Sequence, residues 1–186
     1  MARGRASFEP QFRLGLDGKR WSFIFWGRYR LIERERFLLS VGAHPSIVFR
    51  TASVTLDGSA RNVIVGRRYL ATELAPTYVL SRRATVGLYH LFSRALESDV
   101  ARWTNYVAVR SAITSVPFGA DFTLRVDPQV YWLRLGDQSG TYVNGAVTVS
   151  RRRAPWSLSA MENRVLHTQS AGTRLLWNVS ATYAFR

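Results

Sequence analysis

The closing stretch of the chain, residues 172–186, reads GTRLLWNVSATYAFR and alternates between apolar and mostly small or polar side chains. Its apolar positions are Leu175, Trp177, Val179, Ala181, Tyr183 and Phe185. Successive side chains of a β-strand point to opposite faces, so this pattern predicts a strand with one aromatic, apolar face. The chain therefore ends on a strand whose two faces meet different surroundings.

The same alternation recurs along the rest of the chain, most clearly in Asp121–Trp132. It predicts about eleven strands in hairpin sequence, with turns at Asp17-Gly18, His44-Pro45 and Asp57-Gly58. Because no helical period lies between the strands, we expect one all-β antiparallel meander. Proline removes a donor from the hydrogen-bond ladder, so bulges or strand ends are expected at Pro10, Pro76 and Pro128.

A chain that ends on such a strand, with Tyr183 and Phe185 at its tip, resembles the outer-membrane β-barrel proteins of Gram-negative bacteria. The resemblance implies an antiparallel up-and-down transmembrane barrel of about 10–12 strands, spanning residues 1–186 as a single domain. It also implies an outer-membrane location, with membrane lipid and lipopolysaccharide as neighbours. Tyr183 and Phe185 would then form the signal that the barrel-assembly machinery reads, and Arg186 after them departs from the family pattern.

The composition is compatible with such a barrel, since 47% of the 186 residues are hydrophobic and 13% are aromatic. The longest charge-free stretches, Phe37–Phe49 and Gln138–Ser150, are too short for a membrane helix, which needs about 20 apolar residues. A transmembrane strand needs only about 9–11 residues. The chain has no cysteine and its three histidines are far apart in sequence, so neither a metal site nor a cofactor is predicted.

The net charge of +14 raises the alternative of a soluble basic β-barrel that binds nucleic acid or another polyanion. Nucleic-acid binders concentrate their charge on one helix, tail or patch, whereas arginines here are spread from Arg3 to Arg186. Doublets and a triplet fall where strands are expected to end, at Arg67-Arg68, Arg82-Arg83 and Arg151-Arg152-Arg153. This distribution favours a polar barrel interior with charged rims, and no nucleic-acid partner is predicted.

The candidate functional residues are charged side chains in the polar phase of the expected strands. An arginine facing lipid near the membrane midplane costs about 2–4 kcal/mol, so these side chains are expected to line the lumen. They are Arg13, Arg28, Arg110, Asp121, Arg125, Asp127 and Arg174. The sequence is compatible with two kinds of interior: a satisfied ionic network that plugs a narrow barrel, and a basic, anion-permeable porin-like pore.

No convergent catalytic set is present, so the sequence does not predict an enzyme. The alternative of an outer-membrane lipid-modifying or hydrolytic enzyme would depend on His167, with Glu162 and Ser170 nearby in sequence. His44 lies in an expected turn, and His90 is expected near a strand end.

Two further features concern the strand number and the start of the chain. Eleven strands are an odd number for a bacterial barrel, and no apolar signal-peptide segment follows Met1–Arg5. Both features are explained if the chain is an N-terminally shortened part of a larger barrel. With a periplasmic C-terminus, the connections at Asp17–Lys19, His44-Pro45 and Ser115–Phe118 are expected at the periplasmic end, and the N-terminus at the outer end.

Overall fold

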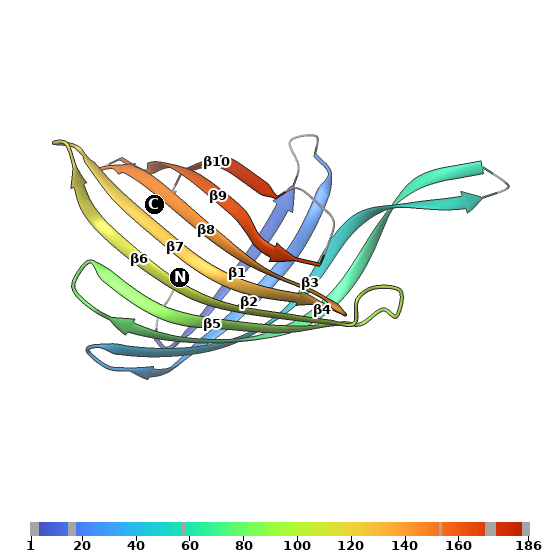
Figure 1. The fold of residues 1–186 in the computed structure, drawn as a ribbon, viewed down its shortest axis with the longest axis horizontal. Helices are drawn as coiled ribbons and strands as arrows, with labels where there is room; N and C mark the ends of the chain where they lie inside the picture. Colours follow the sequence, from blue (N-terminus) through green and yellow to red (C-terminus); the bar gives the residue numbers. More distant parts are fainter. Residues whose placement is uncertain (1–3, 15–17, 57–58, 153, 170–173, 184–186) are drawn as a thin grey trace.

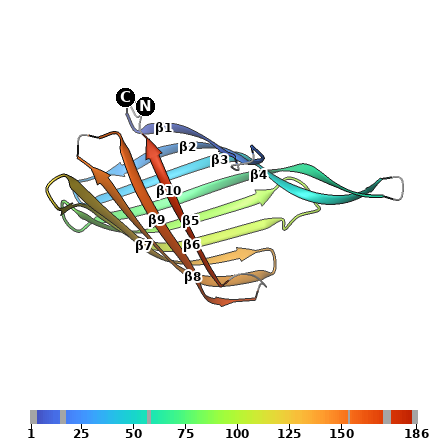
Figure 2. The ribbon, with the colours of Figure 1, turned by 90° about the horizontal axis from the view of Figure 1, so that it is seen from above.

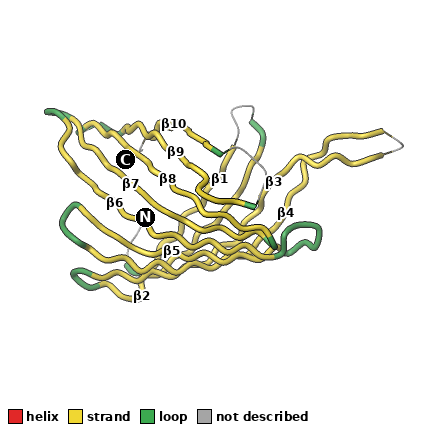
Figure 3. Tube along the Cα trace, in the orientation of Figure 1, coloured by secondary structure: helices red, strands yellow, loops and turns green. Residues whose placement is uncertain are grey.

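The structure is a computed structural model that describes residues 4–14, 18–56, 59–152, 154–169 and 174–183. These residues form one ten-stranded antiparallel sheet in which strands pair with their neighbours in sequence (Figure 1, Figure 3). The strands are β1 (Ala6–Leu14), β2 (Arg20–Glu33), β3 (Phe37–Leu56), β4 (Ser59–Val79), β5 (Ala84–Ala95), β6 (Trp103–Phe118), β7 (Phe122–Leu135), β8 (Gln138–Arg151), β9 (Trp156–Thr168) and β10 (Leu175–Tyr183). The prediction of an all-β, antiparallel, up-and-down fold is confirmed.

The sheet is strongly curled into a half-barrel (Figure 2). Its edge strands are β1 and β10, and no ladder joins them in the described part of the chain. The β3–β4 hairpin projects beyond the other strands (Figure 1). It does so because β3 pairs with β2 only as far as Val48, and β4 pairs with β5 only from Tyr69 onward. Closure of the sheet into a barrel stays a prediction.

The expected turn at His44-Pro45 is wrong, because β3 runs through both residues. Toward β4 the ladder is continuous, with Pro45 opposite Leu70. Toward β2 the ladder is interrupted between Ala43 and Ser46. Proline has no N–H to donate to a ladder. At Pro45 this costs no hydrogen bond, because β3 is not paired with β2 at that position. The two strands that were expected on either side of His44-Pro45 are therefore one continuous strand, β3.

The merged strand changes the strand number and the orientation of the N-terminal part. With ten strands, β1 begins at the same end of the sheet at which β10 ends. The connection before Arg20, expected at that end, lies at the opposite one. The expected connection at Ser115–Phe118 is also wrong, since these residues belong to β6 and the turn follows at Gly119. The odd strand number predicted from the sequence is thus not observed.

The three prolines expected at irregular positions all lie in strands. At Pro76 the ladder toward β5 is interrupted between Leu74 and Thr77, and at Pro128 the ladder toward β6 is interrupted in the same way. Pro10 lies in the edge strand β1, which pairs only with β2. The sheet therefore places each proline where one side of the strand has no ladder bond.

Contacts that skip a strand identify the concave face of the sheet. Arg28 on β2 reaches Glu73 on β4 at 2.6 Å, and Tyr131 on β7 reaches Asn163 on β9 at 2.9 Å. Strands two positions apart are separated by about 9–10 Å, so such contacts form only where side chains converge. These four residues, and those opposite them in register, face the inside of the curl.

The concave face is polar and the convex face is apolar. The polar residues that are buried are Ser22, His44, Ser46, Glu73, Ser93 and Asn144, whereas the buried apolar ones are Trp26 and four alanines. Large apolar side chains are exposed from Phe8 on β1 through Leu88 on β5 to Trp177 on β10. This is the reverse of a soluble domain, in which large apolar side chains are the most buried.

Candidate functional site

An ionic network crosses the concave face from β1 to β5, with Arg28 at its centre. The Arg28 guanidinium donates through Nε to Glu73 Oε1 (2.6 Å) and through Nη1 to Glu9 Oε2 (3.0 Å). The Tyr89 hydroxyl donates to Glu73 Oε2 at 2.6 Å. The Glu73 side chain is 2% exposed, so these two donors, and not bulk water, compensate its charge.

Glycine at position 42 makes this network possible. Gly42 on β3 lies opposite Arg28 on one side and Glu73 on the other. A Cβ at Gly42 would stand 2.7 Å from Glu73 Oε1, which is closer than such atoms approach. The Glu73 side chain can therefore cross β3 only above a residue without a side chain.

Beside the network the concave face is aromatic. The rings of Trp26 and His44 have centroids 3.9 Å apart, and the Arg28 guanidinium lies 4.2 Å from the Trp26 ring. Neither ring nitrogen of the buried His44 has a hydrogen-bond partner among the described residues. His44 borders a cavity of about 280 Å³ that Ser46 and Ser93 also line. Such a cavity is large enough to hold water, which can satisfy these nitrogens.

A groove of about 420 Å³ lies on the concave face from β4 to β7, and we call it the basic groove. It is lined by Arg110, Arg125, Asp127, Gln129, Thr77 and Thr85 among others. Arg125 Nε donates to both Asp127 oxygens, at 2.9 and 2.7 Å, and the Arg110 guanidinium lies 4.5 Å from the Tyr89 ring. The groove thus contains two guanidiniums and one carboxylate, and it can hold a small anion.

Four tyrosines continue the polar wall from β5 to β8. Ring centroids are 5.9 Å apart for Tyr89 and Tyr106, 5.0 Å for Tyr106 and Tyr131, and 4.9 Å for Tyr131 and Tyr142. The Tyr131 hydroxyl donates to Asn163 Oδ1. Phenol hydroxyls both donate and accept hydrogen bonds, so this row makes the wall polar without adding charge.

The structure brings some of the predicted charged residues together. Arg110, Arg125 and Asp127 meet in the basic groove, and Arg28 lies in the ionic network. Arg13 lies on the edge strand β1, where its guanidinium donates to Gln11 Oε1 at 3.2 Å.

The remaining predicted positions lie at the ends of the sheet. Asp121 is in the connection before β7, and Arg174 directly precedes β10, so neither joins the groove or the network. Tyr183 is the last residue of β10 and lies opposite Trp156, whereas Phe185 falls outside the described residues. His167, expected in an outer connection, lies in β9 opposite Thr141.

Sequence reasoning did not single out the tyrosine row or Gly42. The tyrosines were in the polar phase of their strands, which is the signal available for them. Their adjacency depends on the pairing register of four strands, which alternation within one strand does not contain.

Comparison with protein-family models, with characterised proteins and with solved structures found no match. Within the described ranges no cluster of three or more His, Cys, Asp or Glu side chains is arranged to hold a metal ion. The described residues also contain no helix of the length and apolarity that a membrane span requires.

Proposed function

We propose that this chain is an integral β-barrel protein of a Gram-negative outer membrane whose polar interior admits small anions. The observation that carries the proposal is the reversed polarity of the sheet: small and polar side chains are buried, and large apolar ones are exposed. Lipid tails solvate an apolar convex face, whereas a soluble sheet must cover it with a second layer. No such layer exists among the described residues.

A membrane location requires the sheet to close. β1 and β10 each have one edge whose backbone groups lack ladder partners, and lipid offers no replacement. Since the meander has ten strands, β1 and β10 run antiparallel, as all other neighbours do. The proposed barrel therefore closes by pairing of β1 with β10.

The interior is expected to favour anions over cations. In the basic groove Arg110 and Arg125 outnumber Asp127, whereas in the network Arg28 contacts two carboxylates, Glu73 and Glu9, so the anion preference is assigned to the groove. The network narrows the interior on the β1–β5 side and leaves the groove as the positively charged part of the wall. At the end of the sheet where β10 also ends, Arg82-Arg83 and Arg151-Arg152 would meet the phosphate groups of lipid.

Spin labelling of β6 tests the membrane location, because the chain has no cysteine and each label can be introduced singly. Val107 and Val109 are exposed on the convex face, whereas Tyr106 and Arg110 belong to the concave one. In lipid vesicles, labels at 107 and 109 should collide with oxygen, which concentrates in lipid. Labels at 106 and 110 should collide with a water-soluble nickel complex.

Nickel accessibility at all four positions, in a protein that is soluble without detergent, would contradict the proposal. The soluble polyanion binder would then be favoured, and its affinity should fall steeply with salt. A heat-dependent change of mobility on SDS gels is the parallel measurement of barrel closure, since an open sheet should unfold in the detergent without boiling.

A further inference from the structure

The convex face of β9 carries two charges that the membrane location does not explain. Asn163 points to the concave face, where its Oδ1 accepts the hydrogen bond from Tyr131. Its neighbours Glu162 and Arg164 therefore point to the convex face, and both are exposed. Neither forms an ion pair with another described residue. Exposed charges without ion-pair partners are normal on a surface that faces water. The inference therefore rests on the proposed function, in which this surface faces lipid.

Glu162 lies far from the ends of the sheet, and Arg164, two residues farther along β9, lies opposite Leu175, the first residue of β10. Glu162 pairs with Gly145 in the middle of β8 and lies midway between Trp156 and His167 on its own strand. By contrast, three other convex-face arginines, Arg94, Arg134 and Arg151, occupy the last or next-to-last positions of β5, β7 and β8, and Arg68 on the same face of β4 is paired with Glu97. Charges that face lipid near the midplane destabilise a barrel. Contact with lipid alone therefore does not account for Glu162 and Arg164.

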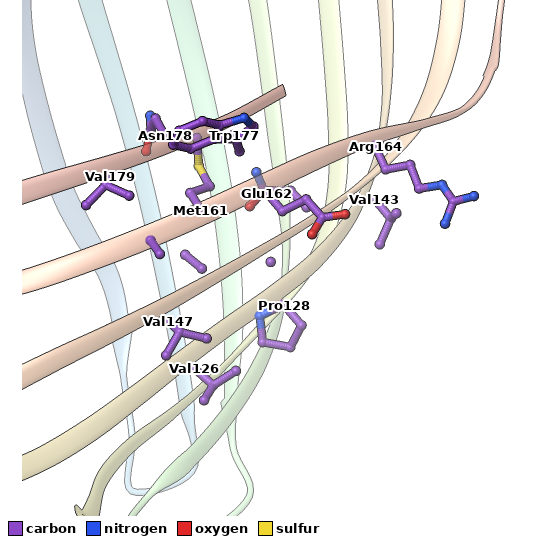
Figure 4. Close-up of a pocket in the computed structure, with 14 residues that line it drawn as sticks. Val126, Pro128, Val143, Val147, Met161, Glu162, Arg164, Trp177, Asn178 and Val179 are labelled. Carbon is purple, nitrogen blue, oxygen red and sulfur yellow. The ribbon is translucent and has the colours of Figure 1, made fainter. Parts of the chain in front are cut away.

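A groove of about 550 Å³ adjoins these charges on the same face. One row in register runs from Pro128 through Gly145 and Glu162 to Trp177. Figure 4 shows Pro128, Glu162 and Trp177 of this row. Gly145 leaves the floor of the groove open, since a Cβ built there meets no atom within 4 Å. The Trp177 side chain at the end of the row is 75% exposed.

We propose that the convex face of β8–β10 is the surface through which two copies of this chain form a dimer in the membrane. Glu162 and Arg164 carry opposite charges at alternate positions of one strand. Both copies face the same way in a membrane, so the two-fold axis runs along the membrane normal and equal residues lie at equal depth. When this axis passes between Glu162 and Arg164, the carboxylate of each copy is two strand positions from the guanidinium of the other, and the four charges alternate in sign. Trp177 of each copy then fills the groove of the other.

A second copy is the occupant that this arrangement favours over lipid. Lipid tails bring no charge, so in lipid Glu162 and Arg164 can pair only with each other, as Arg125 and Asp127 do at the same spacing on β7. A second copy supplies the matching carboxylate and guanidinium together, and ion pairs formed away from water are stronger than exposed ones.

Cysteine cross-linking of the refolded chain in phosphatidylcholine vesicles tests the dimer. Ala160 is exposed on β9 beside the groove, so Ala160→Cys should give an oxidised dimer band. Val109 is also exposed on the convex face of β6, away from the groove, so Val109→Cys serves as the matched control and should stay monomeric. Equal cross-linking of the two variants would overturn the proposal.

Charge reversal in the Ala160→Cys background tests the ion pairs. Glu162→Arg and Arg164→Glu should each reduce the dimer band at least about tenfold, since like charges then meet across the axis. The double reversal restores opposite charges and should restore the dimer, while the number of charges facing lipid stays unchanged. A dimer band insensitive to the single reversals, or a double reversal no better than either single one, would overturn the proposal.

The same vesicles separate failure of this inference from failure of the proposed function. Spin labels at 107 and 109 report insertion independently of the dimer. Oxygen-accessible labels with a monomeric chain overturn the dimer and keep the membrane proposal, whereas nickel-accessible labels overturn both.

Discussion

The Glu73 carboxylate lies directly over the backbone of Gly42, so that a Cβ at position 42 would stand 2.7 Å from Glu73 Oε1. This relationship joins three strands, because Glu73 on β4 crosses β3 to meet Arg28 on β2. Gly42 therefore sets the path of the buried ion pair.

Gly42→Ala should destabilise the fold by about 1–3 kcal/mol, since the methyl group must displace the Glu73 side chain from its partners. Gly27→Ala is the matched control, because a Cβ at Gly27 meets only the Ala43 carbonyl oxygen, at an ordinary 3.5 Å. Urea titration of both variants in detergent micelles measures the difference. Equal midpoints for the two variants would contradict the role of Gly42.

Arg28→Gln and Glu73→Gln should be strongly coupled, because removing Arg28 leaves the Glu73 carboxylate, which is 2% exposed, without its cationic partner. We expect a coupling free energy of about 2 kcal/mol in a double-mutant cycle. The pair Arg30–Glu33 is the control, since its side chains are 46% and 50% exposed. Such an exposed pair should give a coupling below about 1 kcal/mol. Similar couplings for the two pairs would mean that water screens the interior network.

Arg125→Ala should weaken anion preference by about twofold or more, because a charge is removed from the wall of the basic groove. The measurement is the reversal potential across a planar lipid bilayer with a salt gradient. Arg134→Ala is the control, since Arg134 lies near the end of β7 and donates to the Gly136 carbonyl at 2.9 Å. A shift that is equal in both variants would indicate a general effect of net charge. An electrically silent protein would favour the plugged form of the interior.

Glu97, in the connection between β5 and β6, should respond to pH through Arg68. The Arg68 Nε and backbone N–H each donate to the Glu97 carboxylate at 2.8 Å, and these hydrogen bonds hold the pKa of Glu97 below its usual value. Their contribution is therefore complete above the unfolded-state pKa and is lost as the pH falls through the lower, folded-state pKa. Carbon-13 NMR titration of the Glu97 carboxyl group should show the lowered pKa, and Arg68→Gln should raise it. An unchanged titration in Arg68→Gln would exclude this cause.

Alternation within strands was sufficient to assign Arg28, Arg110 and Arg125 to the polar face, because that assignment needs only the period of one strand. It did not predict how these residues meet, because the register between strands is set by packing across the sheet. The His44-Pro45 dipeptide is typical of a turn, yet β3 continues through it because the proline occupies a gap in one ladder.

Glu162 and Arg164, the charges on the convex face of β9, show a second point that the sequence pattern could not predict. Alternation in Trp156–Leu166 is weaker than elsewhere, and Glu162 and Arg164 occupy the apolar phase. The sequence thus shows that two charges interrupt the apolar phase of this strand. Only the contact of Asn163 with Tyr131 fixes the face to which these charges point.

The pairing of each strand with its sequence neighbour has a consequence for the order of folding. Hairpins can form one after another along the chain, and β3–β4 has the longest ladder on which to begin. In the proposed barrel, the junction of β1 with β10 would be the sole pairing between residues distant in sequence, so its loop-closure entropy is the largest. Closure is therefore expected to be the last and slowest step. A variant that weakens the edge of β1 should accumulate as a curled, open intermediate with nine intact hairpin junctions.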